Sequence, residues 1–349
     1  MEKVTTKLIN LGSNSKIDQS LIECVINISE GRNSKSLKTI TNILSNYSNV
    51  CLLHVDIGKA ANRSVLTIIG DKKSLFDAIF ELFRVATHLI DMQNHQGIHP
   101  RIGAVDVCPF IPFINSNIEE CIGLAHQLGE KIWKELNVPV YLYGKAAKNP
   151  SRISLANCRR GEYEGIPDRM SDDNNYPDFG DSTFNRQSGI SVIGARDFLV
   201  AFNVNLDTPS PDIAKKIAAA IREKRVEKGS VQKGLSCVKA IGWYVEEYGF
   251  AQVSTNILNY EITSLFEVYD SIAKEAEGYG VKVNGSELIG MIPIGALVAT
   301  EKLPSLDSSL RSALIQASVQ RLGLDSISPF IANEKILEIK LMETPWYET

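Results

Sequence analysis

The chain has 349 residues, of which 44% are hydrophobic and 22% charged, and its formal net charge is -4. This length exceeds one ordinary domain and predicts two, each with its own core. The acidic balance argues against nucleic acid as the main partner, because phosphate binding calls for a basic excess. An anionic small molecule is compatible with it, since a local cluster of arginines is invisible in the total.

The sequence also bears on the compartment. No apolar run is long enough to span a bilayer, and no signal-peptide core follows Met1, so we expect no membrane partner. The six cysteines are scattered through the chain without a CxxC pair. Such cysteines are typical of reduced thiols in a core. These features predict a cytoplasmic protein.

The first half predicts one compact unit after a polar, mobile extension at residues 1–18. The apolar patterns predict strand 20–28, helix 34–46, strand 49–57, strand 63–70, helix 72–92 and strand 103–110. This order of strand, helix, two strands, helix and strand is that of a ferredoxin-like unit. Such a unit has an antiparallel sheet with both helices on one face. Helix 118–136 and strand 138–143 extend it.

Residues 166–189 lack periodicity and are rich in Asp, Asn, Ser, Pro and Gly, which favours an interdomain segment. The same order of elements then returns, with strand 197–206, helix 210–226, strands 236–247 and 250–258, helix 262–279 and strand 281–292. A helix at 308–322 and an irregular end follow. We divide the chain into the extension 1–18, an N-terminal subdomain 19–179, a linker 180–189, a C-terminal subdomain 190–330 and a tail 331–349.

The connection between helix 72–92 and strand 103–110 is the strongest candidate for a site. It contains His95 and His99, and Gly97 and Pro100 interrupt any helix there, so the histidines need not share a face as a metal-binding pair would. We therefore expect no metal. Pro100 favours extended backbone at His99, which aims the ring out of the loop and suits a general acid/base. The alternative is that both histidines only hydrogen-bond the loop to itself.

Residues 95–112 of this connection resemble the HxGxHPRxGAxDVCPFIP signature of the glutamate formiminotransferase family. Further matches run from about residue 20 to about residue 330, at 27–33 (NISEGRN), 62–63, 141–144, 194–196, 201–206, 241–244 and 251–256. The resemblance implies an α+β fold of two ferredoxin-like subdomains, with antiparallel or mixed sheets and a folate site between them. It implies transfer of the formimino group of N-formimino-L-glutamate to N5 of tetrahydrofolate, a step of histidine breakdown.

The resemblance assigns roles to two residues. His99 matches the family's catalytic histidine, and Asp56 matches an active-site aspartate. The substrate's amidinium is a planar cation that a carboxylate can pair with, as it pairs with a guanidinium. The alternative for Asp56 is a turn-forming aspartate before Gly58.

Both substrates carry carboxylates, so arginines should converge on the site and bind them in bidentate fashion. The alternative for each arginine is a solvated surface or an internal salt bridge. Residues 180–189 match a folate-contacting loop of the family, although an ordinary linker would look similar. The expected binding residues are Arg63, Arg101, His95, Gly180, Phe184, Arg186 and Gly189.

Two departures from the family pattern bear on the substrate. Ile98 stands where an acid is usual, and His54 stands where an aspartate is common. They leave open a glutamate formyltransferase that uses 5-formyltetrahydrofolate or N-formylglutamate, and a noncatalytic folate-binding protein. A homodimer is expected from an apolar sheet face left over by the duplicated units. Any cyclodeaminase activity is expected on a separate protein.

Overall fold

The computed structural model describes residues 19–172, 175–223, 234–298 and 308–346. The chain divides into two compact units, and the division falls between Asp197 and Phe198. Residues 180–189, expected as a linker, belong to the N-terminal unit. The extension expected at residues 1–18 lies outside the described residues.

The N-terminal unit is built on a six-stranded sheet with the order β2-β3-β1-β4-β6-β5. Its strands are β1 (Leu21–Ile28), β2 (Val50–Gly58), β3 (Arg63–Gly70), β4 (Val105–Ile114), β5 (Val140–Gly144) and β6 (Ser191–Ala195). The first four pair antiparallel, whereas β6 runs parallel to both β4 and β5, so the sheet is mixed. Strand β6 was not predicted, because its five residues follow a polar stretch without alternation.

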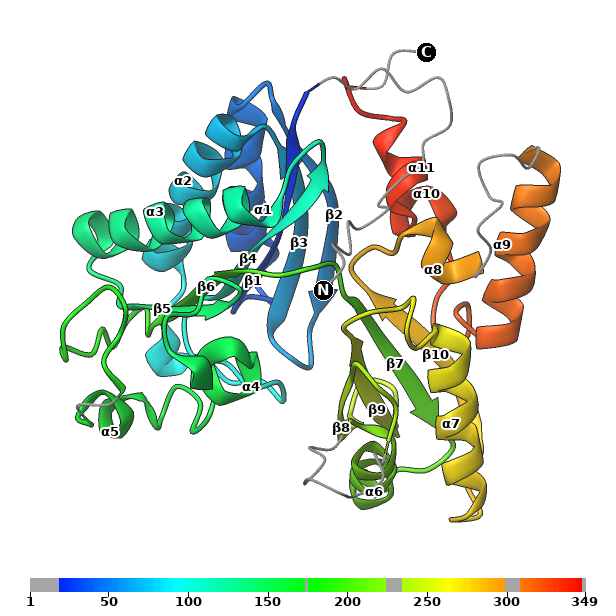
Figure 1. The fold of residues 1–349 in the computed structure, drawn as a ribbon. Helices are drawn as coiled ribbons and strands as arrows, with labels where there is room; N and C mark the ends of the chain where they lie inside the picture. Colours follow the sequence, from blue (N-terminus) through cyan, green and yellow to red (C-terminus); the bar gives the residue numbers. More distant parts are fainter. Residues whose placement is uncertain (1–18, 173–174, 224–233, 299–307, 347–349) are drawn as a thin grey trace. The chain divides into compact units, whose positions relative to one another are not determined.

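Three helices cover one face of this sheet (Figure 1). They are α1 (Ser34–Asn42), α2 (Lys72–Leu89) and α3 (Ile118–Leu136). Alternate residues of β1, at positions 22, 24, 26 and 28, join the core under these helices. Because successive side chains of a strand point to opposite faces, Glu23 and Asn27 lie on the other face. The helix expected at 72–92 ends at Leu89, and a separate 3-10 turn follows at Met92–Asn94.

Part of the opposite face is covered by the segment that follows β5. This segment contains a 3-10 turn at Pro150–Ile153, α4 (Leu155–Cys158) and α5 (Ile166–Met170). It forms a second apolar cluster with sheet residues that include Val107, Tyr141 and Val192. The part of this face that β1, β2 and β3 form instead carries polar side chains, and these include His54, Asp56, Arg63 and Thr67.

The C-terminal unit has a four-stranded antiparallel sheet with the order β10-β7-β9-β8. Its elements are β7 (Val200–Leu206), α6 (Pro211–Ile221), β8 (Val238–Val245), β9 (Phe250–Ile257), α7 (Leu265–Glu277) and β10 (Val283–Ile289). Their order confirms the predicted repetition of strand, helix, two strands, helix and strand. Helix α6 ends at Ile221, earlier than the expected residue 226.

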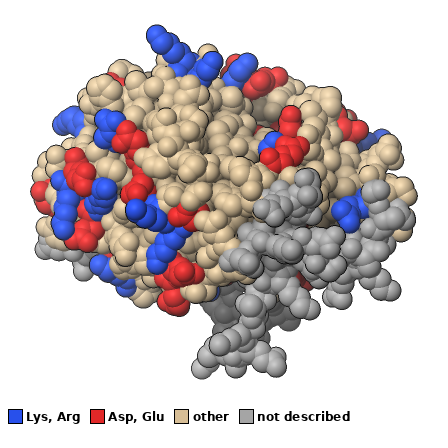
Figure 2. All heavy atoms as spheres, turned by 90° about the horizontal axis from the view of Figure 1, so that it is seen from above, with Lys and Arg blue, Asp and Glu red and all other residues tan. Residues whose placement is uncertain are grey.

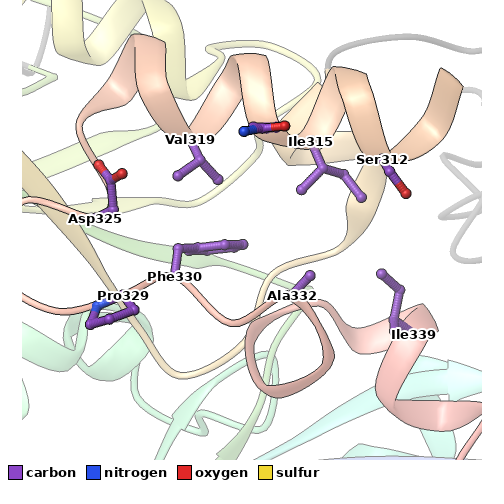
Figure 3. A pocket seen from close by; sticks show the side chains of 9 residues that line it. Ser312, Ile315, Val319, Asp325, Pro329, Phe330, Ala332 and Ile339 are labelled. Atoms are coloured by element: carbon purple, nitrogen blue, oxygen red, sulfur yellow. The ribbon is translucent and has the colours of Figure 1, made fainter. Parts of the chain in front are cut away.

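The end of the C-terminal unit is helical. Helix α9 (Ser308–Leu322) has the predicted bounds, whereas α8 (Ile294–Val298), α10 (Ala332–Lys335) and α11 (Leu337–Leu341) were not predicted. Each of these three covers five residues or fewer, which is too short for a periodic signal. A hollow of about 450 Å³ lies between α9 and residues 325–339, with Phe330 facing Ile315 and Val319 (Figure 3).

The surface carries both signs of charge. On the face shown in Figure 2, lysines and arginines lie interspersed with aspartates and glutamates. Among the described residues, no helix has both the length and the apolar character needed to cross a membrane.

Candidate active site

The candidate catalytic residues lie on the face of the N-terminal sheet opposite α1, α2 and α3, and in the loops at its edge. The strand register places Asp56 of β2 opposite Val65 of β3, and Val65 opposite Asn27 of β1. Asp56 and Asn27 therefore share this face two strands apart, which is roughly 10 Å. His54 lies on the same face, and its Nε2 is 3.1 Å from Oδ2 of Asp56.

Asn62 joins three loops at this edge. Its backbone is left-handed, with φ of 47°, in the turn between β2 and β3. Its side chain accepts a hydrogen bond from the backbone N–H of Gly31 at 3.1 Å and donates one to the carbonyl of Gln96 at 3.1 Å. Its own carbonyl lies 2.7 Å from Nε2 of His95. Since a carbonyl only accepts, that nitrogen carries the proton. His95 thus ties the histidine loop to the turn between β2 and β3, a contact with another segment and not within the loop itself.

Two glycine positions allow close backbone contact around the histidine loop. A Cβ on Gly97 would lie 2.1 Å from the carbonyl oxygen of Ala61, and one on Gly103 would lie 2.0 Å from that of Ile190. Gly103 also forms a β-bridge with Gly189, whose φ is 68°. The C-terminal end of the loop 180–189 is therefore bonded to the end of the histidine loop.

His99 has the environment of a base. Its Nδ1 lies 2.7 Å from the carbonyl of Pro100, which only accepts, so Nδ1 carries the proton and Nε2 the lone pair. Nη1 of Arg63 lies 2.6 Å from both ring nitrogens. Burial, followed by the positive charges of Arg63 and Arg159, holds the pKa of His99 well below 6.5. The ring is therefore neutral at physiological pH.

Asn27 aims Arg63 at His99. The Arg63 Nη2 donates to Oδ1 of Asn27, and the Asn27 amide donates to the carbonyl of Val25 at 2.9 Å. Burial and the neighbouring charge of Arg159 lower the pKa of Arg63 to about 9, so it is still a cation at neutral pH. Its buried Nε has no hydrogen-bond partner among the described residues.

Arg159 is a site residue that the sequence analysis missed. It follows α4 and forms a salt bridge with Asp106, which is fully buried and also accepts the backbone N–H of Ile102 at 3.1 Å. Its Nε is buried, with no partner found in the described part of the chain. The motif Arg160-Gly161-Glu162-Tyr163-Glu164-Gly165 follows it directly. The sequence of an arginine pair in a loop does not show which of the two turns inward.

Arg101 is engaged by acids of the same motif. Its guanidinium donates to Glu164 at 2.5 and 2.7 Å and to Glu162 at 3.0 Å, and it also donates to the carbonyl of His95 at 3.2 Å. Its side chain is largely buried, and the two carboxylates raise the pKa of Arg101. These contacts favour the internal salt bridge named above as the alternative, so Arg101 holds the histidine loop in place.

The loop 180–189 turns at its glycine ends and presents an aromatic contact. Gly180 has φ of 136°, a conformation that favours glycine. The Phe184 ring lies 5.2 Å from the Tyr163 ring, and the Tyr163 hydroxyl donates to the carbonyl of Arg186. The side chain of Arg186 is exposed, so the structure does not bring it to His99 as it brings Arg63 and Arg159.

The arrangement supplies one neutral histidine, a carboxylate on the sheet face, and two arginines, of which Arg159 forms a salt bridge with the buried Asp106. Unpartnered guanidinium N–H groups are costly when buried, and an anion would satisfy them. Within the described ranges, no group of three or more His, Cys, Asp and Glu side chains is arranged to hold a metal ion.

Replacing Arg63 by Gln tests the electrostatics of His99. Removing the adjacent cation favours the imidazolium form, so the pKa of His99 should rise toward its ordinary value of about 6.5. An NMR titration of the His99 ring measures it. Arg84→Gln on the exposed face of α2 is the control and should leave this pKa unchanged. An unchanged pKa in Arg63→Gln would show that burial alone sets it.

The two units match two family models in chain order. The one described as "Formiminotransferase domain, N-terminal subdomain" covers residues 21–196, and the one described as "Formiminotransferase domain" covers residues 201–342. The boundary between these matches agrees with the division of the structure after Asp197.

Named relatives fall into two groups. Formimidoyltransferase-cyclodeaminase of Rattus norvegicus is 43% identical over 91% of this chain, and the chain spans 59% of that relative's length. Glutamate formimidoyltransferase of Streptococcus pyogenes is 42% identical over 80% of this chain and 91% of its own length. The protein of that name from Thermoplasma acidophilum is 40% identical over 81% and 91%. This chain therefore belongs to the formiminotransferase family.

Proposed function

We propose that this chain is a glutamate formimidoyltransferase. It would transfer the formimino group of N-formimino-L-glutamate to N5 of tetrahydrofolate and release L-glutamate and 5-formiminotetrahydrofolate. The observation that carries the proposal is the neutral His99, with its Nε2 lone pair, on the side of the sheet that also holds Asp56. The names of two relatives that the chain covers almost completely support it.

The reaction requires one proton to move from the attacking amine to the leaving amine. In the proposed mechanism, N5 of tetrahydrofolate attacks the amidinium carbon, and Nε2 of His99 takes the N5 proton in exchange for its contact with Nη1 of Arg63. The tetrahedral intermediate then collapses as the bond from carbon to the glutamate nitrogen breaks. His99 returns the proton to that nitrogen. These two proton transfers require a histidine that is neutral before the reaction begins.

Asp56 is the proposed partner of the amidinium. A carboxylate on an open sheet face can accept two parallel N–H bonds from a planar cation. His54 stands on the same strand, and its Nε2 lies 3.1 Å from Oδ2 of Asp56, so it would orient that carboxylate. The arginines Arg63 and Arg159 would bind the substrate carboxylates through their unpartnered N–H groups. Arg101 and His95 would hold the loop on which His99 stands.

Finer features of the architecture belong to the same proposal. In a ferredoxin-like unit the first and third strands lie in the centre of the sheet. β1 and β3 do so among the four antiparallel strands of the first sheet, and β7 and β9 do so in the second, which supports such a unit in both halves. A folate site that includes Gly180, Phe184, Arg186 and Gly189 would follow the family. The six free thiols suit a reducing cytoplasm.

We also infer a homodimer. The outer strand β8 exposes Ile241 and Tyr244, and β2 at the edge of the other sheet exposes Ile57. Exposed apolar residues on edge strands invite pairing with another chain. Sedimentation equilibrium of the purified chain should give twice the monomer mass of 38.5 kDa. A monomer mass at micromolar concentration would contradict this inference.

Changing His99 to Ala should lower the turnover of N-formimino-L-glutamate with tetrahydrofolate by about 10²- to 10⁴-fold, because the proton transfer loses its catalyst. Folate binding, measured separately, should survive. His88→Ala, on the exposed end of α2, is the matched control and should keep full activity.

A wild type that does not transfer the formimino group would point to one of the alternatives. A wild type that turns over only N-formylglutamate or 5-formyltetrahydrofolate would replace the formimino assignment with a formyl one. A wild type that binds folate but transfers neither group would favour a binding protein.

Changing Asp56 to Asn should lower kcat/KM for the formimino donor by about 10-fold or more, since the amidinium loses its ionic partner. The formyl group is neutral, so any residual formyl transfer should fall much less. Initial rates with both donors measure the difference, and Asp168→Asn on the exposed side of α5 serves as control. An equal loss with both donors would show that Asp56 supports the fold and does not read the charge.

A further inference from the structure

Asp106 is a fully buried carboxylate to which the proposed mechanism gives no role. It stands at a β-bulge in β4. Asn27 of β1 pairs with Val107, whereas the next residue of β1, Ile28, pairs with Val105. Asp106 is therefore the extra residue of the bulge, without a pairing partner on β1.

The bulge decides on which face of the sheet the Asp106 side chain lies. Successive side chains of a regular strand alternate between faces, so Asp106 would otherwise lie on the side of Cys108, in the core under the helices. Its contacts are instead with Ile102 and Arg159. Ile102 and Cys158, the residue before Arg159, belong to the second apolar cluster on the opposite face. Bulges often redirect a side chain in this way beside active sites.

Asp106 joins two segments that meet at His99. Its Oδ1 accepts the backbone N–H of Ile102 at 3.1 Å, three residues after His99 in the histidine loop. Its Oδ2 accepts a hydrogen bond from Nη2 of Arg159. The charge of Arg159 acts on His99 together with burial and the charge of Arg63, and all three lower the pKa of the imidazole. One carboxylate thus contacts both the loop that carries His99 and a cation that acts on it.

Packing alone does not account for an ion pair at this place. Burying two opposite charges costs about as much free energy as their attraction returns, so such pairs are a weak source of stability. The side chain of Arg159 is 13% exposed, and solvent is therefore within its reach. Without the carboxylate of Asp106, the guanidinium would turn toward water, because a buried charge without a partner is costly.

We propose that Asp106 is a positioning residue that holds the guanidinium of Arg159 near His99 and fixes the loop that carries this histidine. The inference rests on the proposed function, because His99 is the base of the proposed reaction. Held in this place, Arg159 helps to keep the imidazole unprotonated before the reaction and presents its Nε to a substrate carboxylate. Asp106 acts through Arg159 and the loop and does not touch the reacting atoms.

The first test is an NMR titration of the His99 ring in the full chain without substrates. Asp106→Asn keeps the size of the side chain and removes its charge, so Arg159 should turn to solvent. Because the loss of that cation favours the imidazolium form, the pKa of His99 should rise toward its ordinary value. The chain has five histidines, and His99→Ala identifies the signal. An unchanged or lower pKa would show that Arg159 stays in place without Asp106, which overturns the inference.

Arg159→Gln completes a double-mutant cycle. Alone, it should raise the pKa of His99 by removing the same cation, and Asp106→Asn added to it should then cause no further rise. A full second rise in the double variant would show that Asp106 acts independently of Arg159 and would contradict the proposal. An unchanged pKa in Arg159→Gln also contradicts it, even where Asp106→Asn fails to fold.

A second buried ion pair of the same unit supplies the matched control. Asp178 forms a salt bridge with Arg152 at 2.8 Å and accepts the backbone N–H of Leu142 at 2.7 Å, and the side chains of the pair are 6% and 8% exposed. Asp178→Asn should lower the melting temperature, as Asp106→Asn should, but leave the pKa of His99 unchanged. An equal rise of this pKa in Asp178→Asn would show a general loosening of the unit and overturn the specific role of Asp106.

Turnover adds a readout and separates this inference from the proposed function. In Asp106→Asn the acid limb of the kcat profile should move to higher pH, because the reaction needs neutral His99, and KM for N-formimino-L-glutamate should rise about 10-fold. A wild type that transfers no formimino group while the titrations behave as expected overturns the reaction and supports the placement of Arg159 by Asp106. A chain that transfers the group but fails the titrations supports the reaction and overturns the positioning role.

Discussion

The geometry of the site depends on Asn62, a residue with no proposed role in the reaction. Asn62 has a left-handed backbone and bonds Gly31, Gln96 and His95 at once, so the ends of three loops are fixed by a single side chain and carbonyl. Asparagine is among the few residues with a side chain that adopt this conformation at low cost. These bonds hold the histidine loop at residues 95–96, and the β-bridge between Gly103 and Gly189 holds its other end, so the position of His99 relative to the sheet follows from both.

Burial and two neighbouring cations keep His99 neutral, which is the form that the proposed base requires. The charges of Arg63 and Arg159 both lower the pKa of His99, and Asp106 forms a salt bridge with Arg159, so an added proton on the ring would meet two cations. The same positive charge would also attract the anionic substrates of the proposed reaction. One cluster would then have two effects, since it keeps the imidazole neutral and offers cations to the substrate carboxylates.

Sequence predicted the long elements and the site loop well, because periodicity and an extended motif are local signals. Helices 118–136 and 308–322 have the predicted bounds. Strand β6 was missed, since its pairing with β4 and β5 is set by distant residues. The roles of Arg101 and Arg159 could not be read either. The fold of the segment after β5 decides which arginine pairs with Glu162 and Glu164 and which lies near His99. The amino-acid composition of that segment does not predict its fold.

The β-bridge between Gly103 and Gly189 has a consequence for how this family can vary. It fixes the end of the loop 180–189 by backbone contact, at a place where no side chain fits. The middle of the loop, at residues 181–183, is exposed and bears little of that constraint. Insertions and exchanges should therefore accumulate in the middle while the glycine end stays unchanged. Changes in the middle of the loop would thus leave the bridge, and the loop that carries His99, in place.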